Sequence, residues 1–276
     1  MGKPAHAGIF QRLPREDNVI KNTVLPSLLA GLITLAPSLS HSSPTIAGGT
    51  EVPPGHIIAR TTVALLMDVA DGQALCTGSI IEDDIILTAA HCIDGAIKTT
   101  IVFGTELRKA RHVTLATATF VAPGYRTNAK TPDIALVRFE GGLPAGYETA
   151  EIMPSTRSPK KRERVILAGY GITSMKEQKG SGVLRQVEQT ITSSSGPQAY
   201  EVTVTQRGKT GACPGDSGGP AYTENGHQLF GIASRIFLPF ISPCGVRAVY
   251  TNANHPEMRQ LIQTEIENLR KLPSGR

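Results

Sequence analysis

Gly215-Asp216-Ser217-Gly218-Gly219-Pro220 is the most informative stretch of this 276-residue chain. It places a serine in a turn so rich in glycine that backbone N–H groups can point towards whatever the serine attacks. A serine hydroxyl is a weak nucleophile at neutral pH, so a catalytic role requires a general base, an acid that orients the base, and an oxyanion site. The rest of the sequence offers candidates for all three.

The candidate base and acid lie upstream in two short motifs. His91 belongs to Thr88-Ala89-Ala90-His91-Cys92, which follows an apolar stretch and precedes a turn. Asp133 opens the run Asp133-Ile134-Ala135-Leu136-Val137, where a solvated carboxylate is not expected. The order along the chain is His91, Asp133, Ser217. Because these residues are far apart in the sequence, only a compact fold can bring them together.

With these motifs in this order, the chain resembles the serine endopeptidases of the trypsin and chymotrypsin family over nearly all of residues 46–276. The resemblance implies that His91, Asp133 and Ser217 form a catalytic triad. It also implies an oxyanion hole made by the backbone N–H groups of Gly215 and Ser217. Ser234 matches the family serine that hydrogen-bonds the triad acid, and it opens the segment along which peptide substrates pair as an added strand.

Short β-rich runs separated by turn signals predict an all-β fold, a sandwich or a barrel, for the chain beyond its leader. The resemblance implies two six-stranded antiparallel β-barrels with the active site in the cleft between them. The first barrel is expected at about 46–150 and the second at about 160–252, with the boundary near 141–159. The predicted β-rich runs are 61–67, 78–87, 100–103, 113–121, 134–139, 165–168, 200–205, 229–234 and 246–251.

The C-terminal segment predicts an amphipathic helix at about 255–270. Asn254 can cap it, and Pro256 suits its first turn. The apolar stripe has the width usual for a packed helix, which favours docking on the second barrel over a membrane-surface role. The residues at helical spacing are Met258, Leu261, Ile262, Ile266 and Leu269.

An apolar stretch at 24–37, preceded by basic residues and followed by small ones, indicates a signal peptide within residues 1–40. It contains two prolines and is shorter than the roughly 20 apolar residues that span a membrane. A secreted or periplasmic protein is therefore expected. An uncleaved anchor, a true start downstream of Met1 and a buried structural helix are the alternatives.

Four cysteines in an exported chain suggest two disulfides, with three possible connectivities. The family resemblance selects Cys76 with Cys92 and Cys213 with Cys244. No pair has C-x-x-C spacing and no histidine lies at ligand spacing, which disfavours zinc. The segment 103–112, which matches the family's calcium loop, has only Glu106 as a carboxylate. We expect no metal and no cofactor.

Ile46-Ala47-Gly48-Gly49-Thr50 resembles the mature N-terminus of the family, where a newly freed α-amine inserts into the protein. Its partner there is the acid before the nucleophile, which here is Asp216. Residues 41–45 would form a short propeptide. Because Thr45 stands where an activating cleavage by a trypsin-like protease needs Lys or Arg, another protease is expected to act. The alternative is a plain Gly-Gly turn entering the first strand.

The resemblance places Gly211 at the floor of the primary specificity pocket and Ala248 at a second pocket position. Neither residue is charged, which disfavours cleavage after Lys or Arg. Ile236 is expected to narrow the pocket mouth. The predicted preference is for small or medium apolar residues, as in elastase, with a chymotrypsin-like preference second. The segment 235–243 is longer than is usual in the family, and forms either an apolar lip for substrate or a docking patch.

Two other functions compete with that of a peptidase. Gly215-Asp216-Ser217-Gly218-Gly219 satisfies the G-x-S-x-G pattern of α/β-hydrolases, but no aspartate follows Ser217 and the preceding pattern is not βαβ. A non-catalytic binding module on the same double barrel is the remaining alternative, and the complete triad disfavours it.

The expected partners are polypeptide substrates, protein inhibitors and an activating protease, for a monomeric protein. The net charge of +5 is modest, and the chain has no Trp and few aromatic residues, which argues against nucleic acid. A cluster of basic residues is most simply a solvated loop, with an exosite for acidic substrates as the alternative. The cluster comprises Arg157, Lys160, Lys161, Arg162 and Arg164.

Overall fold

The structure is a computed structural model, and it describes residues 47–126, 131–174, 176–206, 210–237, 244 and 246–273. The expected leader and propeptide, Ile46, and most of the segment 238–245 lie outside the described residues. Among the residues that are described, no helix has the length and apolar character needed to cross a membrane.

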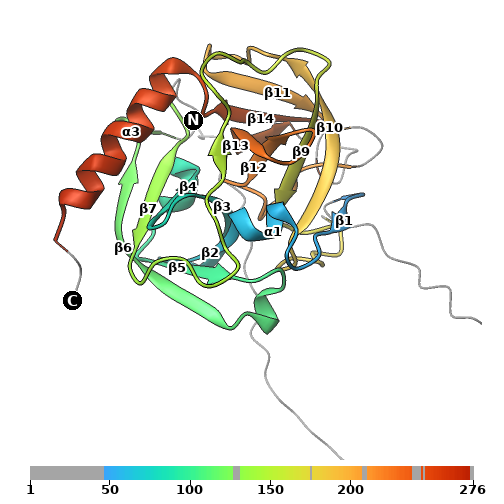
Figure 1. The fold of residues 1–276 in the computed structure, drawn as a ribbon. Helices are drawn as coiled ribbons and strands as arrows, with labels where there is room; N and C mark the ends of the chain where they lie inside the picture. The colour runs from blue at the N-terminus through green and yellow to red at the C-terminus, as the bar shows by residue number, and fades with distance from the viewer. Residues whose placement is uncertain are drawn as a thin grey trace, which may run out of the picture.

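The first half of the chain forms a closed antiparallel barrel with the strand order β2-β3-β4-β7-β6-β5 (Figure 1). The inner faces of its strands are apolar, and β4 is buried along its whole length. These residues therefore remove a continuous apolar surface from water, which drives closure. The strands are β2 (Thr62–Val69), β3 (Gly72–Glu82), β4 (Ile85–Thr88), β5 (Lys98–Phe103), β6 (His112–Val121) and β7 (Ala135–Phe139).

The second half forms another closed barrel of six strands, because β10 pairs with both β9 and β11. The short strands β1 (Thr50–Glu51) and β8 (Glu151–Ile152) add to its outside, on β10 and β13. The predicted all-β architecture of two six-stranded barrels is confirmed. The barrel strands are β9 (Arg164–Gly169), β10 (Arg185–Ser193), β11 (Glu201–Thr205), β12 (Pro220–Thr223), β13 (Gln228–Phe237) and β14 (Arg247–Asn252).

The β-rich runs of the sequence miss two barrel strands, β10 and β12. In β10 polar residues alternate with apolar ones on the buried face, where Arg185 and Gln189 lie, so the usual apolar period is hidden. The strand β12 is short and begins at Pro220. The predicted run 78–87 is in fact divided between β3 and β4 by a turn at Asp83 and Asp84.

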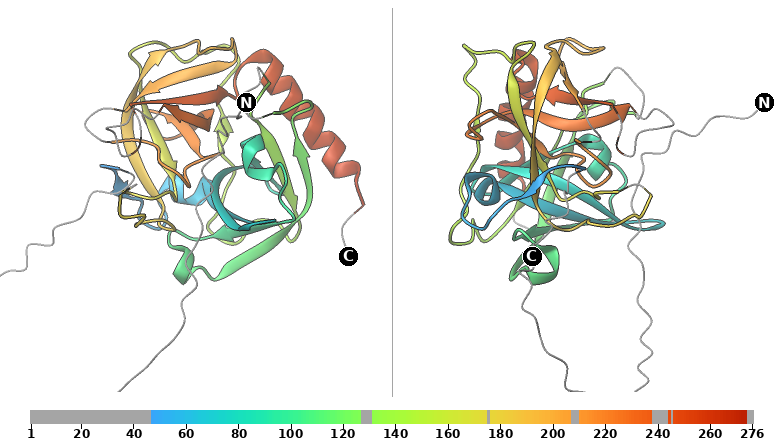
Figure 2. Two further views of the ribbon diagram at one scale, coloured as in Figure 1. Left: turned by 180° about the vertical axis from the view of Figure 1, so that it is seen from behind. Right: turned by 90° about the vertical axis from the view of Figure 1, so that its right-hand side faces the viewer.

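The C-terminal helix α3 (Pro256–Lys271) packs on the first barrel, so the predicted docking on the second barrel is wrong (Figures 1 and 2). It begins just after β14 and runs back along β6 and β7. Arg138 of β7 donates to the carbonyls of Leu269 and Leu272, at the helix end where cations are favoured. Arg270 adds an ion pair with Asp84.

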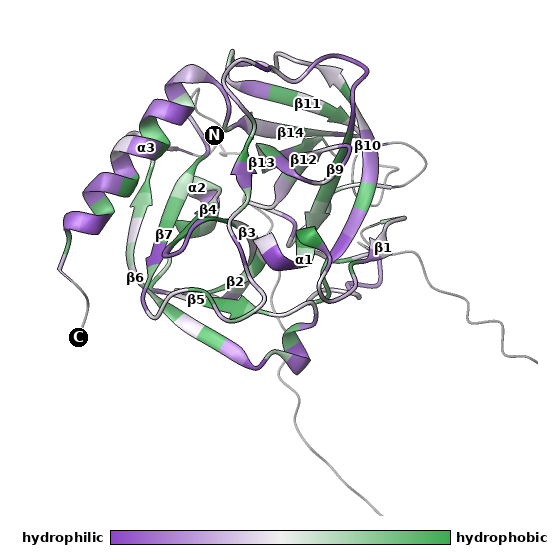
Figure 3. Cartoon of the chain, in the orientation of Figure 1, coloured by the Kyte–Doolittle hydropathy of each residue, from purple (hydrophilic) through white to green (hydrophobic). Residues whose placement is uncertain are grey.

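The helix is amphipathic, as its alternating purple and green bands in Figure 3 show. Met258, Ile262 and Leu269 are buried in the larger core cluster, which contains the apolar residues of the first barrel and several from the second half of the chain. The N-cap is His255 and not Asn254. The side chain of Asn254 instead donates to backbone carbonyls before β9, one of them that of Pro154.

Three short helical segments complete the described fold: α1 (Ile57–Thr61), α2 (Ala90–Ile93) and the 3-10 turn η1 (Leu107–Lys109). The α2 segment follows β4 directly and carries His91. It is therefore the element that presents the candidate base at one end of the first barrel.

Candidate active site

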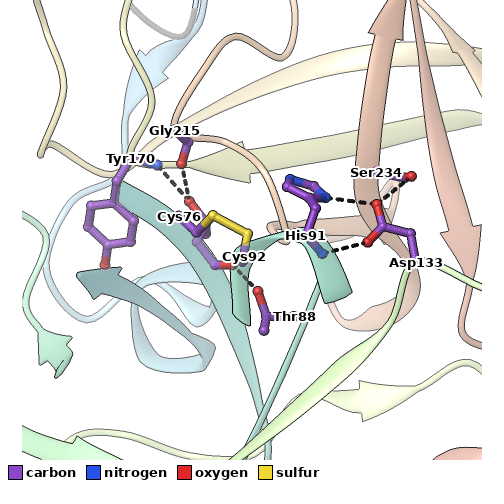
Figure 4. The surroundings of a disulfide bond; sticks show 9 residues. Cys76, Thr88, His91, Cys92, Asp133, Tyr170, Gly215 and Ser234 are labelled. Carbon is purple, nitrogen blue, oxygen red and sulfur yellow. Dashed lines mark hydrogen bonds and ion pairs between the residues drawn. A yellow bond between two sulfur atoms is a disulfide. The ribbon is translucent and has the colours of Figure 1, made fainter. Parts of the chain in front are cut away.

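His91 and Asp133 meet because the strands next to them are paired in the first barrel. Thr88 at the end of β4 lies opposite Ala135 at the start of β7. His91 Nδ1 lies 2.8 Å from Asp133 Oδ2, and the backbone N–H of His91 donates to Oδ1 at 3.0 Å (Figure 4). The carboxylate thus holds both the ring and the backbone of His91. With its proton on Nδ1, the imidazole keeps Nε2 free as an acceptor.

The second barrel also contacts the carboxylate. Ser234 Oγ on β13 donates to Asp133 Oδ2 at 2.7 Å, which is the contact that the resemblance implies (Figure 4). Thr251 Oγ1 on β14 donates to the backbone carbonyl of Asp133 at 3.1 Å. Asp133 is therefore fixed from both halves of the molecule.

The electrostatics of this pair keep the acid charged and make the base stronger. Burial lowers the pKa of His91, but the charge of Asp133 and the hydrogen bond to it outweigh burial, so the pKa is raised above its ordinary value. Burial raises the pKa of Asp133, but the interactions with His91 and Ser234 outweigh it, so the pKa is lowered. Asp133 is consequently ionised at neutral pH.

Ser217 lies in a turn of the second barrel that packs on strands of the first. The Ser217 carbonyl accepts from the backbone N–H of Thr77 on β3 at 2.8 Å. Gly218 has φ of +74°, and a Cβ there would lie 2.0 Å from Thr88 Oγ1. Only glycine allows this turn to lie so close to the end of β4.

The turn that carries Ser217 lies against Thr88 and Ala89, just before the α2 segment that carries His91. No hydrogen bond joins the Ser217 hydroxyl to the His91 ring among the described residues. Such bonds are often long in sites without a substrate and tighten when one binds. The backbone N–H groups of Gly215 and Ser217 likewise have no hydrogen-bond partner in the described parts of the chain. Both are available to an oxygen that enters the site.

Two disulfides hold the loops of the site. Cys76 on β3 is joined to Cys92 on α2, next to His91 (Figure 4). Cys213 is joined to Cys244. This is the pairing that the family resemblance implies. Cys76, His91 and Cys92 lie close enough to suggest a metal site. Both sulfurs are in the disulfide, however, which leaves His91 as the only ligand of that group.

Asp216 is a fully buried carboxylate just before Ser217. Its oxygens accept from the backbone N–H groups of Cys213 and Gly171, both at 2.8 Å. Burial raises the pKa of Asp216 to about 7, although these two hydrogen bonds and the charge of Arg185 act in the opposite direction. The expected partner, Ile46, lies outside the described residues, so the activation pair stays a prediction.

The neighbour of Ile46 is described and is buried beside this loop. Ala47 packs in a small cluster with Ile172 and the Cys213–Cys244 disulfide. Its carbonyl accepts from the N–H of Gly211 at 2.9 Å. Ala47 therefore lies against residues of the loop that leads to Asp216.

The expected pocket residues come together around one buried cluster. Ile236 on β13 lies opposite Ala248 on β14. Ile236 packs against the cluster that contains Ala248 and Ala212, the neighbour of Gly211. Gly211 itself has no room for a side chain, since a Cβ there would lie 2.5 Å from Cγ of Gln206.

Two polar residues around the site were missed from the sequence. Gln206 is buried beside Gly211, and its Nε2 donates to the carbonyls of Ala212 and Cys244. Thr77 hydrogen-bonds the Ser217 turn from the first barrel. Neither belongs to a motif with an obvious mechanism, so nothing in the local sequence marks them.

The double barrel, with His91 and Asp133 on one half and the Ser217 turn on the other, places the chain in the class of serine proteases built on two β-barrels. A family model described as Trypsin matches residues 46–256. The chain belongs to the trypsin family and is a serine endopeptidase.

Curated relatives support this assignment. The chain is 31% identical over 220 residues to brachyurin of Leptuca pugilator. The aligned region covers 75% of this chain and 92% of brachyurin. It is 31% identical over 213 residues to serine protease SP24D of Anopheles gambiae, covering 72% of this chain and 73% of that protein.

Solved structures share the fold at lower identity. One titled as HL collagenase has a TM-score of 0.68 and 17% identity, covering 79% of this chain and 97% of that chain. A structure titled human heparin binding protein has a TM-score of 0.65 and 21% identity, covering 83% of this chain and 99% of that chain. Because one of these proteins is named as a collagenase and the other as a heparin binding protein, the fold alone does not define an activity.

Proposed function

We propose that the chain hydrolyses peptide bonds through an acyl-enzyme formed on Ser217. The observation that carries this proposal is the 2.8 Å contact between His91 Nδ1 and Asp133 Oδ2 beside the Ser217 turn. In the first step Ser217 Oγ attacks the scissile carbonyl while His91 Nε2 takes its proton. His91 then gives that proton to the leaving amine. Water repeats the sequence on the ester and regenerates the serine.

The oxyanion of each tetrahedral intermediate would be stabilised by the N–H groups of Gly215 and Ser217. Both groups belong to the turn that is packed against β3 and β4, which supports an oxyanion site that is formed before substrate binds. Their lack of intramolecular partners in the described residues supports this role. Substrates are expected to be polypeptides that pair with β13 beyond Ser234.

Activation is proposed to proceed by insertion of the Ile46 α-amine next to Asp216. A buried carboxylate with a pKa of about 7 lacks a sufficient countercharge, and a protonated amine would supply one. The buried position of Ala47 supports this path for the chain. The leader supports export, in which case signal peptidase and then a second protease would expose Ile46.

Covalent labelling of Ser217 by a phosphonofluoridate tests the proposal with two purified chains. One begins at Ile46, and the other retains Ser43-Pro44-Thr45 before it. We expect rapid labelling of Ser217 in the first chain and little in the second, because only the first has an amine that can pair with Asp216. The modified residue is identified by mass spectrometry of the digested protein.

The outcomes separate the parts of the proposal. Labelling of neither chain would favour a binding module that uses the same fold. Equal labelling of both chains would leave the serine chemistry in place and reject the activation mechanism.

The ion pair requires ionised Asp216 and a protonated amine. At low pH the effect is lost as the pH falls through the pKa of Asp216, which pairing lowers from about 7. At high pH it is lost as the pH rises through the pKa of the amine, which pairing raises above its ordinary value of about 8.

The preference before the cut is proposed to be for small or medium apolar residues. Gly211 and Ala248 bring no charge to the pocket, and the amide of Gln206 fills the space beside Gly211. Ile236 packs against the cluster that holds Ala248, which supports the expectation that its branched side chain narrows the pocket. A deep, acidic pocket for Lys or Arg is therefore disfavoured.

Ile236→Gly is expected to move the preference from Ala and Val towards Phe before the cut. Because pocket discrimination per methylene is about 10- to 200-fold, we expect the Phe-to-Ala ratio of kcat/KM to rise by about 10-fold or more. Chromogenic peptides that differ only at this residue measure the ratio. The same substitution at Ile97, exposed at 74% on the first barrel, is the control. Fastest cleavage after Lys or Arg by the unmodified enzyme would contradict the proposed pocket.

A further inference from the structure

Thr77 on β3 makes four hydrogen bonds around the Ser217 turn, although it belongs to the other barrel. Its Oγ1 donates to the carbonyl of Gly215 at 2.9 Å and accepts from the N–H of Tyr170 at 3.1 Å. Its backbone N–H donates to the carbonyl of Ser217 at 2.8 Å. Its own carbonyl accepts from Thr88 Oγ1 at 2.9 Å. Thr77 is completely buried.

These bonds fix the direction of the hydroxyl proton. Since Oγ1 accepts from the Tyr170 N–H, its proton is left for the Gly215 carbonyl, which lies at hydrogen-bond distance. The hydroxyl is therefore a bridge with one defined orientation. It joins β3 of the first barrel to two separate loops of the second barrel.

Thr77 donates hydrogen bonds to the carbonyls of Gly215 and Ser217. These are the two residues whose N–H groups are proposed to form the oxyanion hole. One carbonyl is held by the Thr77 side chain and the other by its backbone. The two residues flank Asp216, whose carboxylate is fixed separately by Cys213 and Gly171. The turn is thus anchored at three successive residues, and two of the three anchors come from Thr77.

We propose that Thr77 is a positioning residue for the oxyanion hole, in which its hydroxyl fixes Gly215 so that the N–H groups of Gly215 and Ser217 converge on one point. This inference rests on the proposed acyl-enzyme mechanism. Without the hydroxyl, the Gly215 carbonyl loses its tether to β3 and the loop can rotate. The Thr77 hydroxyl acts on the transition state through Gly215 and does not itself touch the substrate.

The test compares Thr77→Val, which removes the hydroxyl and nearly keeps the shape, with Thr77→Ser, which keeps the hydroxyl. For Thr77→Val we expect kcat to fall about 10- to 100-fold. This fall is no larger than the fall in kcat caused by removing one complete oxyanion donor. KM should change by less than about threefold. Thr77→Ser is expected to stay within about threefold of the unmodified enzyme in both.

A peptidyl aldehyde inhibitor provides a second readout, because the oxygen of its hemiacetal occupies the position of the oxyanion. Its inhibition constant should rise by the same factor by which kcat falls, whereas binding of a peptide product should not change. A change that only loosened the fold would not produce this selective effect.

Thr61→Val is the matched control for loss of a buried threonine hydroxyl between the barrels. Thr61 Oγ1 lies 2.8 Å from the Tyr222 hydroxyl and donates to the Ile57 carbonyl, away from the Ser217 turn. We expect Thr61→Val to lower the unfolding temperature as Thr77→Val does, because each leaves buried polar groups unpaired. Its kcat and aldehyde affinity should remain within about twofold of the unmodified enzyme.

If Thr77→Val does not fold, Thr77→Ala and Thr77→Ser differ only in the hydroxyl and give the same comparison. Unchanged kcat and aldehyde affinity in the variant without the hydroxyl would overturn the proposal. So would an equal loss of kcat in Thr61→Val, since the effect would then be one of general stability. If the unmodified chain that begins at Ile46 neither cleaves peptides nor is labelled, the proposed function itself fails and this inference falls with it.

Discussion

Ser217→Ala is expected to lower kcat by about 10⁵- to 10⁶-fold. The variant retains the Gly-rich turn, the His91–Asp133 pair and the oxyanion N–H groups, but it has no atom that can form the acyl bond. The residual rate over water should come from the oxyanion site and substrate binding alone. KM for a good peptide substrate should change little, because in the proposed mechanism Ser217 forms the acyl bond and takes no part in strand pairing.

Active-site titration and steady-state hydrolysis of a chromogenic peptide measure this loss. Ser174→Ala is a suitable control, because Ser174 is also partly exposed and, within the described parts of the chain, its hydroxyl contacts only the nearby Glu177 N–H. Full activity and full labelling are expected for that variant. A Ser217→Ala enzyme with more than a few per cent of normal kcat would mean that another nucleophile performs the reaction.

The catalytic candidates were identifiable from the sequence because each lies in a motif whose chemistry requires particular neighbours. Gly218 is the clearest case: the structure shows that a side chain there would collide with Thr88, so the glycine next to the serine is required by packing. The pairing of His91 with Asp133, in contrast, depends on the register of β4 against β7. That register is a tertiary property, and the family resemblance supplied it before the structure did.

Other features could not be predicted because their causes are not local. The stripe of apolar residues on α3 shows that the helix packs on something, but not on which barrel. The choice is made by groups distant in the sequence, such as Arg138, which donates to the last carbonyls of the helix. Thr77 is similar, because it lies just before the predicted β-rich run 78–87 and belongs to no motif with a known chemistry. Only the approach of Gly215 and Tyr170 from the second barrel gives its hydroxyl a role.

Asp133→Asn is expected to lower kcat by about 10⁴-fold while leaving the fold intact. The carboxylate accepts from His91 Nδ1–H, which keeps the proton off Nε2. The amide that replaces it can donate its own N–H to Nδ1, which places the ring proton on Nε2. In that tautomer His91 cannot accept the proton of Ser217, so the nucleophile is not activated even though every group is in place.

The pH dependence of kcat/KM provides a second readout of the same substitution. In the unmodified enzyme the charge of Asp133 outweighs burial and raises the pKa of His91, so activity is lost as the pH falls through that raised value. In Asp133→Asn burial is no longer opposed by a charge, and the acid limb should move to lower pH. Asp68→Asn, which replaces a carboxylate that contacts Gln73 on the outside of the first barrel, should leave both kcat and the acid limb unchanged. An acid limb that stays in place in Asp133→Asn would show that Asp133 does not set the protonation of His91, and the assignment of the triad would have to be revised.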